Sequence, residues 1–273
     1  MRVLIAVLAF AACPGCVDLI GHMDAKYVER EEKRFTVSGK PDVTLSTKDG
    51  AIEIRPWDKS EVEVVVEKRG GDKSSVADIA VNASQNDNHI SIQVDWPKHN
   101  GLSFGFSKSA KLIVSVPRNS DVIAKSGDGS IDVERLAGRI ELRSGDGSIK
   151  ARDLEGDVNV QTGDGSIAVD GKFTALRAHT GDGSVTIRAV QGSGASGDWD
   201  VTTGDGSVTL ELPDDFNGEL DAHTGDGRVN INDLKLSEVS GELRRNSVRG
   251  RLGSGGRQVR VRTGDGSITL RRS

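Results

Sequence analysis

The chain is poor in the residues that cross-link a fold or fill a bulky core. Its 273 residues include 2 cysteines, 6 prolines and only 4% aromatic residues. Both cysteines, Cys13 and Cys16, lie near the N-terminus, so no disulfide framework can hold the rest of the chain. No long stretch has helical periodicity, which leaves small and β-branched residues to fill a narrow core. The composition therefore indicates an all-β chain without a disulfide scaffold.

A strong charge of one sign is also absent. The chain has 36 Lys and Arg residues against 41 Asp and Glu residues, and its formal net charge is −5. The two signs are mixed along the sequence, whereas a nucleic-acid-binding domain presents a basic patch and an anionic membrane attracts polybasic segments. We therefore expect no nucleic-acid partner and no polybasic contact with a membrane.

One motif, Ser/Thr-Gly-Asp-Gly, dominates the sequence. The aspartates of its first four copies stand at positions 128, 146, 164 and 182, so each copy follows the one before it at the same interval. A fixed period of about 20 residues indicates one supersecondary unit stacked on itself. The seven copies are centred on Asp128, Asp146, Asp164, Asp182, Asp205, Asp226 and Asp265.

Apolar and polar residues alternate on both sides of each motif. Around Asp164, for example, Val158 and Val160 precede the corner in alternation, and Ile167 and Val169 follow it in the same way. A period of two on both sides of a glycine-rich corner predicts strand, turn, strand. Three less regular copies fit the same frame, the last with Arg249 in place of the aspartate: residues 47–52, 85–90 and 247–252.

Two topologies can stack such a unit. In a β-solenoid each copy is one coil and equivalent strands pair in parallel, whereas in a meander each Gly-Asp-Gly is a hairpin turn. Inward Ser or Thr before the corner and inward Ile or Val after it favour a corner that keeps one interior. We therefore predict a repetitive, parallel β-helix-like solenoid of about 18–23 residues per coil. Its N-terminal coils would be irregular over residues 36–121, and the regular repeat would fill residues 122–273 of the same domain.

Stacked corners would place their aspartates in a column, about 4.8 Å apart. Two such charges repel by about 3.5 kcal/mol at an effective dielectric constant of about 20. We expect the carboxylates to accept hydrogen bonds from their own turns and the flanking glycines to supply the turn dihedrals. We expect the inward hydroxyls to satisfy one another, and Arg249 to reduce the repulsion from Asp226 and Asp265.

Calcium binding along the aspartate column is the alternative, as in β-roll proteins whose glycine-rich nonapeptides carry Asp. Each corner offers only one carboxylate, however, whereas Ca²⁺ takes roughly six to eight oxygen ligands. The interval between copies is also about twice that of a nonapeptide repeat. We therefore expect structural turns at these aspartates, with no metal and no cofactor.

The N-terminus predicts export. A positive start, Met1-Arg2, precedes an apolar run that is too short to span a bilayer and is typical of a signal peptide. Small residues before Cys13 resemble a bacterial lipoprotein signal over residues 1–16, with Cys16 as the alternative lipidated cysteine. Residues 17–35 would form a polar tether. We expect a protein of the bacterial cell envelope, lipid-anchored to a membrane on the periplasmic or surface side, and a secreted protein as the second choice.

The chain resembles the DUF4097 family of putative adhesins, bacterial envelope proteins of repeated β-strands. The resemblance rests on residues 49–58, 62–64 and 112–117 together with the run of Ser/Thr-Gly-Asp-Gly-Ser-Ile copies, and it covers roughly residues 35–273. It implies a β-solenoid-like surface domain. It implies no catalytic residues.

These observations favour a non-catalytic scaffold or binding protein of the adhesin type, whose partner is another envelope protein or a glycan. Departures from a repeat are where binding faces are built, so Trp199 and the inserts 188–198 and 211–219 are candidate ligand sites. A calcium-stabilised β-roll is one alternative. A carbohydrate-active β-helix enzyme using Asp214 and Asp215 is the other. Because the last copy lacks an obvious cap, we also expect end-to-end self-association.

Overall fold

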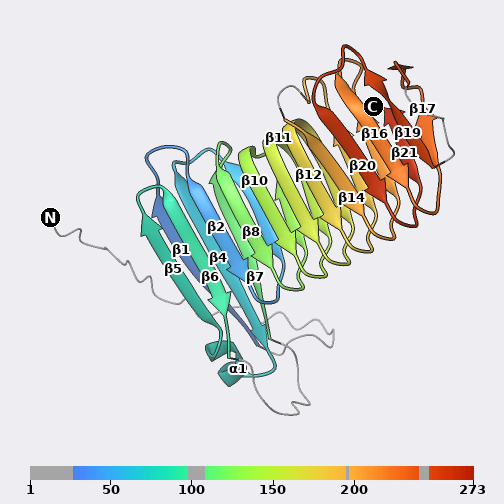
Figure 1. Ribbon diagram of the computed structural model, residues 1–273. Coiled ribbons are helices and arrows are strands. Elements are labelled where there is room, and N and C mark those ends of the chain that lie inside the picture. Colours follow the sequence, from blue (N-terminus) through green and yellow to red (C-terminus); the bar gives the residue numbers. More distant parts are fainter. Residues whose placement is uncertain (1–26, 98–107, 195–196, 240–245) are drawn as a thin grey trace.

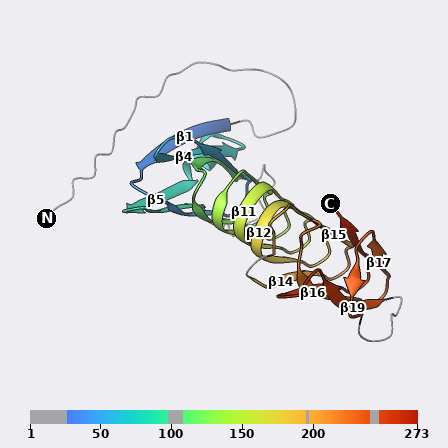
Figure 2. The same cartoon turned by 90° about the horizontal axis from the view of Figure 1, so that it is seen from above.

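The computed structural model describes residues 27–97, 108–194, 197–239 and 246–273. Within these residues the chain is almost entirely β-strand, and its strands form one 21-stranded sheet around a single hydrophobic interior. Coils follow one another along one axis (Figures 1 and 2). The one helix of the described residues, α1 (Lys73–Ala77), is five residues long.

Each regular coil contributes one strand to a front face and one to a back face, joined at the Gly-Asp-Gly corner. Two strands, β11 and β12, cross from the back face to the front face without a break. In spatial order the front face contains β5 (Ala80–Asn86), β6 (His89–Asp95), β2 (Asp42–Thr47), β8 (Asp121–Ser126), β10 (Ala137–Ser144), the C-terminal halves of β11 (Ile149–Thr162) and β12 (Ile167–Thr180), β14 (Trp199–Thr203), β20 (Gln258–Thr263), β16 (Gly218–Thr224), β19 (Ser247–Leu252) and β18 (Leu236–Ser237). The back face contains β1 (Tyr27–Thr36), β4 (Glu61–Gly70), β7 (Ser109–Pro117), β3 (Ile52–Trp57), β9 (Ile131–Glu134), the N-terminal halves of β11 and β12, β13 (Val185–Ala189), β15 (Val208–Leu212), β21 (Ile268–Arg272) and β17 (Val229–Asn232).

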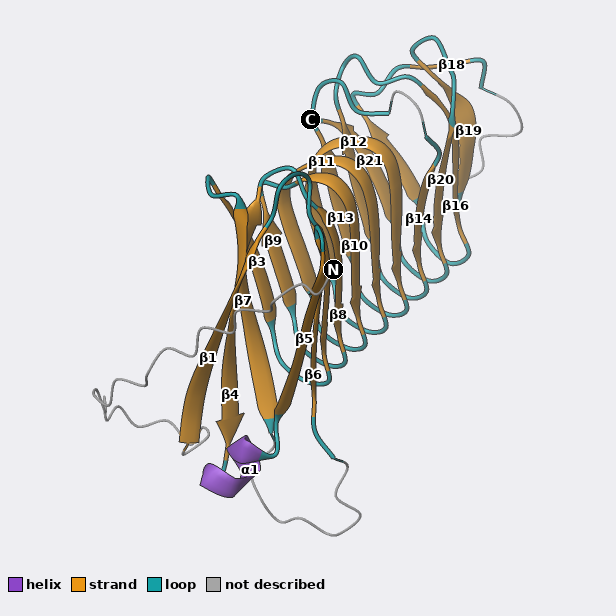
Figure 3. Ribbon diagram, turned by 90° about the vertical axis from the view of Figure 1, so that its left-hand side faces the viewer, coloured by secondary structure: helices purple, strands orange, loops and turns teal. Residues whose placement is uncertain are grey.

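Equivalent residues of successive copies lie side by side in parallel register. Ser144 on β10 pairs with Ser126 on β8. Ile149 on β11 pairs with Ile131 on one side and with Ile167 on the other. A meander of hairpins would pair neighbouring copies antiparallel instead. The predicted all-β solenoid is therefore confirmed, with the corners aligned along one edge (Figure 3).

The alternation in the sequence sorts each strand into inward and outward residues. On β14, for example, Val201 and Thr203 are buried, while Asp200 and Thr202 are partly exposed. The inward side chains of both faces form one continuous core that is mostly aliphatic. Burying each large apolar side chain contributes about 1.5–3 kcal/mol, and a single coil leaves its two open sides exposed until neighbours cover them.

The order of coils in space differs from their order in the sequence at both ends. At the N-terminal end, β2 lies between β6 and β8, and β3 lies between β7 and β9. At the C-terminal end, β20 lies between β14 and β16, and β21 lies between β15 and β17. The last copy of the motif is therefore an interior coil. Our expectation that this copy would be an uncapped end was wrong, because strands from earlier in the sequence cover both of its sides.

Antiparallel strands close both ends of the stack. β1 pairs antiparallel with β4, and β5 pairs antiparallel with β6. At the other end β19 pairs antiparallel with β16. The segment 27–35, which we expected to be polar tether, is thus part of a strand. Its charged residues suit a strand because they form ion pairs with charged residues of β4. Arg30 Nη2 lies 2.8 Å from Glu67 Oε2, and Lys68 Nζ lies 2.8 Å from Glu31 Oε2.

Of the three less regular copies, only residues 47–52 form a corner of the stack. Residues 85–90 include the hairpin between β5 and β6, in which Asp87 has a φ of 53°. Residues 247–252 are β19, a strand rather than a corner. Arg249 therefore does not join the aspartate column. Its Nε lies 3.1 Å from Oδ1 of Asp221, which is the nearest carboxylate on the antiparallel partner β16.

Candidate functional site

The corner glycines are required by the close approach of successive coils. A Cβ at Gly147 would lie 2.3 Å from the carbonyl oxygen of Gly129 in the neighbouring coil. A Cβ at Gly165 would lie equally close, 2.3 Å, to that of Gly147. We expected these glycines to supply unusual dihedrals, but among the corner glycines only Gly50 has a positive φ, 142°. The motif therefore sets how closely two coils can stack.

The inward hydroxyl before each corner donates to a backbone carbonyl of a neighbouring coil, and at several corners it also accepts from an N–H of its own corner. Thr180 Oγ1 donates to the carbonyl oxygen of Gly165 at 2.8 Å and accepts from the N–H of Gly183 at 3.3 Å. Thr203 repeats the pattern, donating to Gly183 at 2.7 Å. The predicted bonding of hydroxyls to one another was wrong, because the hydroxyls donate to glycine carbonyls of the adjacent coil instead. These bonds tie coil to coil at every corner.

The corner carboxylates form a column of eight along this edge. Asp49 is partly buried and the others are exposed. Within the described residues none of them accepts a hydrogen bond or forms an ion pair, so the predicted bonds from their own turns are not found. Burial, and after it the charge of Asp128, raises the pKa of Asp49. In stacking order the column consists of Asp49, Asp128, Asp146, Asp164, Asp182, Asp205, Asp265 and Asp226.

A cation site at this column would need more oxygen atoms than one coil supplies. Within the part of the chain that the structure describes, no group of three or more His, Cys, Asp or Glu side chains could hold a metal ion. Neighbouring corners are about 4.8 Å apart, and Ca²⁺ takes roughly six to eight oxygen ligands at shorter distances. The column is a line of negative charge along one edge.

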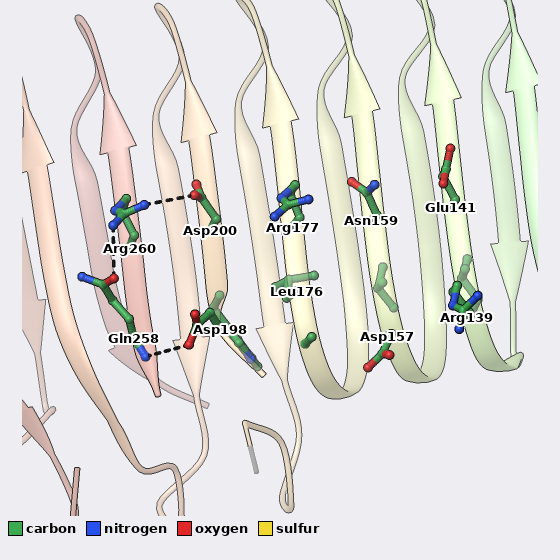
Figure 4. Close-up of a pocket in the computed structure, with 14 residues that line it drawn as sticks. Arg139, Glu141, Asp157, Asn159, Leu176, Arg177, Asp198, Asp200, Gln258 and Arg260 are labelled. Atoms are coloured by element: carbon green, nitrogen blue, oxygen red, sulfur yellow. Dashed lines mark hydrogen bonds and ion pairs between the residues drawn. The ribbon is translucent and has the colours of Figure 1, made fainter. Parts of the chain in front are cut away.

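A shallow groove of about 390 Å³ crosses the outer side of the front face, over β10, β11, β12, β14 and β20 (Figure 4). Parallel register builds it, because outward residues of neighbouring strands fall into rows. The first row consists of Arg139, Asp157, Ala175, Asp198 and Gln258. The second row consists of Glu141, Asn159, Arg177, Asp200 and Arg260.

Polar contacts hold one end of the groove. Arg260 Nη2 donates to Oε1 of Gln258 at 3.1 Å, and Nη1 lies 3.6 Å from Oδ2 of Asp200. The backbone N–H of Gln258 donates to Oδ1 of Asp198 at 3.3 Å. Figure 4 shows these side chains linked across β14 and β20. This end of the groove is therefore arranged before any ligand arrives.

Arg177 is the cation at the centre of the groove. It is exposed in the middle of the second row, between Asn159 and Asp200 on the neighbouring strands. Within the described residues it forms no hydrogen bond or ion pair with its side chain. A guanidinium stays charged at any physiological pH and presents five N–H donors in a planar fork. Arg177 is thus a free donor group at the centre of the groove.

Comparison with known proteins identifies the family. A family model described as Toastrack DUF4097 matches residues 41–271. The chain belongs to this family. No curated protein matches the chain. The groove therefore lies on the front face of a Toastrack fold.

Several solved structures are similar to this Toastrack chain at low identity. A putative cell adhesion protein from Clostridium sporogenes is 15% identical, covers 90% of this chain and 100% of its own, and has a TM-score of 0.43. A putative adhesin from Bacteroides fragilis is 14% identical, and the match covers 93% of this chain and 100% of the adhesin, with a TM-score of 0.47. A putative lipid binding protein from Parabacteroides distasonis is 12% identical, and the match covers 91% of this chain and 98% of that protein, with a TM-score of 0.31.

The inserts that we marked as candidate ligand sites have structural contacts. Trp199 is 1% exposed and packs edge-on against Phe173 and Phe216, with ring centroids 5.8 Å and 4.9 Å away. It is a core residue, and its inward position on β14 could be read from the alternation. Asp214 forms an ion pair with Arg272, and Asp215 accepts from the N–H of Gly192 at 3.0 Å. The two carboxylates therefore brace loops of this Toastrack chain.

The predicted export signal and both cysteines lie outside the described residues. Among the residues that are described, no helix is long and apolar enough to cross a membrane.

Proposed function

We propose that this protein is an exported, non-catalytic component of the bacterial cell envelope that binds another envelope component through the groove on its front face. The observation that carries the proposal is the groove itself. Rows of polar side chains stand on five rigid parallel strands, and its central cation, Arg177, has no internal partner among the described residues. Rigid strands hold such groups in place without the entropic cost of ordering loops.

The N-terminus supplies the location in this proposal. Lipidation at Cys13, or at Cys16 as the alternative, would hold the solenoid at a membrane and leave the groove free to meet its ligand. Anchoring also raises the effective concentration of the protein at the surface, so weak individual contacts add up across many copies. The membrane itself, another envelope protein and a glycan are the partners that fit this arrangement.

Binding of the full chain to isolated cell envelopes tests the proposal. The variant Ala175→Gln places a long side chain in the first row of the groove, between Asp157 and Asp198. Lys150→Gln, an exposed residue on the back-face half of β11, serves as the matched control. We expect co-sedimentation with envelopes to fall for Ala175→Gln and to stay unchanged for Lys150→Gln. Equal binding of both variants and the parent chain would refute a role for the groove.

A specific observation at the N-terminal end of the stack favours self-association. β5 is an edge strand of the front face, exposed over most of its length, and its seven residues carry no charge. By contrast, the edge strand β1 is rich in Glu, Arg and Lys, which discourage pairing with another chain. We propose that two copies pair through β5, antiparallel, at high concentration. Sedimentation of the parent chain and of Ser84→Lys tests this, because a lysine on β5 would remove a dimer formed at that edge.

A further inference from the structure

The first row of the groove has a gap at its centre. Ala175 on β12 pairs with Asp157 on β11, and on its other side it lies next to Asp198, the residue immediately before β14. Because strands are about 4.8 Å apart, the two carboxylates lie about 10 Å apart. Between them stand the methyl group of Ala175 and the backbone of Gly197, which packs against it. A ligand that enters here meets a carboxylate on either side and Arg177 directly beyond, two residues along the same strand.

Both flanking carboxylates keep spare acceptor capacity. Asp157 accepts a hydrogen bond from the hydroxyl of Thr174, and Asp198 accepts one from the backbone N–H of Gln258. An ionised carboxylate has about four acceptor sites, so each side chain can take further hydrogen bonds without giving up the first. These internal bonds also hold the carboxylates in position. The first row is therefore suited to a ligand rich in hydroxyl donors.

The second row adds the opposite requirement. Arg177 has only donors and no acceptor, and its planar fork matches a carboxylate with two parallel hydrogen bonds. Asn159 beside it offers both a donor and an acceptor, and its Oδ1 already accepts from Gln161 at 3.3 Å. A ligand that satisfies both rows needs hydroxyl groups for the aspartates and an anionic, planar group for Arg177.

The charges of the groove exclude other classes of ligand. Its rows hold three arginines against four carboxylates, so a dense polyanion such as a phosphate polymer would be repelled along most of its length. A polycation would meet Arg177 at the centre. Among the described residues that line the groove, the one aromatic side chain, Trp199, is 1% exposed, so an apolar ligand finds no surface to bury. A ligand with many hydroxyls and a lower density of negative charge than a phosphate polymer remains.

The direction of the groove indicates a linear ligand. It crosses five parallel strands, and successive strands add one residue to each of the two rows at the regular strand spacing along the axis of the solenoid. We propose that the groove binds an acidic polysaccharide of the uronic acid type, with one ligand carboxylate on Arg177 and ligand hydroxyls on Asp157 and Asp198. This inference rests on the proposed function and names the chemical class of its ligand.

Oligogalacturonate and its methyl ester are the matched probes, because they share a backbone and differ in the charge of the carboxyl group. Titration calorimetry with the full chain measures both. We expect the acidic oligomer to bind about tenfold more tightly than the ester, since a bidentate, charge-assisted pair with Arg177 is lost on esterification. Arg177→Gln should weaken binding of the acid by about tenfold and leave the ester unchanged. Arg177→Lys should fall between, because it keeps the charge and loses the fork.

Lys150→Gln is the control for net charge, and a thermal melt of each variant checks that it folds. Equal binding of acid and ester, or an Arg177→Gln effect that is the same for both, overturns the assignment of Arg177. Absence of binding to either oligomer overturns the uronic acid ligand. If Ala175→Gln still loses envelope binding in that case, the proposed function stands with a different ligand. If Ala175→Gln keeps envelope binding, the proposed function fails as well.

Discussion

Replacing Thr180 by valine would measure how strongly one corner ties two coils together. The side chain of Thr180 is fully buried, and its hydroxyl serves two backbone groups, the carbonyl of Gly165 and the N–H of Gly183. Valine has nearly the same shape, so the change removes hydrogen bonds while it leaves no cavity. Both backbone groups belong to buried residues and would lose this partner.

The magnitude follows from the cost of unsatisfied buried groups. Each of the two groups costs about 1–3 kcal/mol, so we expect the free energy of unfolding to fall by about 2–6 kcal/mol. Domains are stable by only about 5–15 kcal/mol in total, which makes the effect large. Urea denaturation of the full chain measures it as a lower midpoint with an unchanged slope.

Two control variants isolate the hydroxyl. Thr180→Ser keeps it and should lose much less stability. Thr186→Val makes the same chemical change at an exposed, outward position of β13 and should stay within about 0.5 kcal/mol of the parent chain. A loss for Thr180→Val that stays within the range of an ordinary surface substitution, or an equal loss for Thr186→Val, would show that the hydroxyl does not hold the coils together.

Three further results are expected. Gly147→Ala should destabilise the chain severely or prevent folding, because its Cβ would lie 2.3 Å from the carbonyl oxygen of Gly129; a normal melt would refute coil spacing as the role of this glycine. Added NaCl should raise the melting temperature, because salt screens the repulsion between the aspartates of the column. Asp164→Asn should also raise the melting temperature and should make it less dependent on salt. If the variant shows the same salt dependence as the parent chain, the column is not repulsive. Burial alone would raise the pKa of Glu67, but hydrogen bonds from Arg69 and Arg30 outweigh it and lower that pKa. Glu67 therefore stabilises the fold above its unfolded pKa and loses this contribution as pH falls through the folded pKa, so Glu67→Gln should cost stability at pH 7 and much less at about pH 3, as urea denaturation at both values would show.

The regular part of the fold could be predicted from the sequence because two patterns agree there: the alternation within each copy and the constant interval between copies. The alternation around Asp164 assigns Val160 and Ile167 to the interior, and the constant interval between copies of the motif requires equivalent residues to stack. The order of the coils could not be predicted. Pairing β21 with β15 and β17 depends on contacts far apart in the sequence, and every copy carries nearly the same corner, so no motif tells one neighbour from another.

The groove was harder to find from the sequence than the corners. Its rows follow from the alternation, but its depth depends on one small outward residue, Ala175, between two aspartates that lie far apart in the sequence, at positions 157 and 198. The inserts between copies of the motif drew attention to Trp199 and Asp214 instead. The signal that could have found the groove is the break in a polar outward row, which becomes visible only after the register of neighbouring coils is known.

The interior position of the last coil has a consequence for when this protein can finish folding. The chain leaves the ribosome with its N-terminus first. Strands β16 and β17 emerge before β20 and β21, yet they stack on these later strands and not on β14 and β15. The coil of β16 and β17 therefore has no template until β20 and β21 have been synthesised. Completion of the fold is tied to the synthesis of β20 and β21, so a chain interrupted before them would lack two coils and not one.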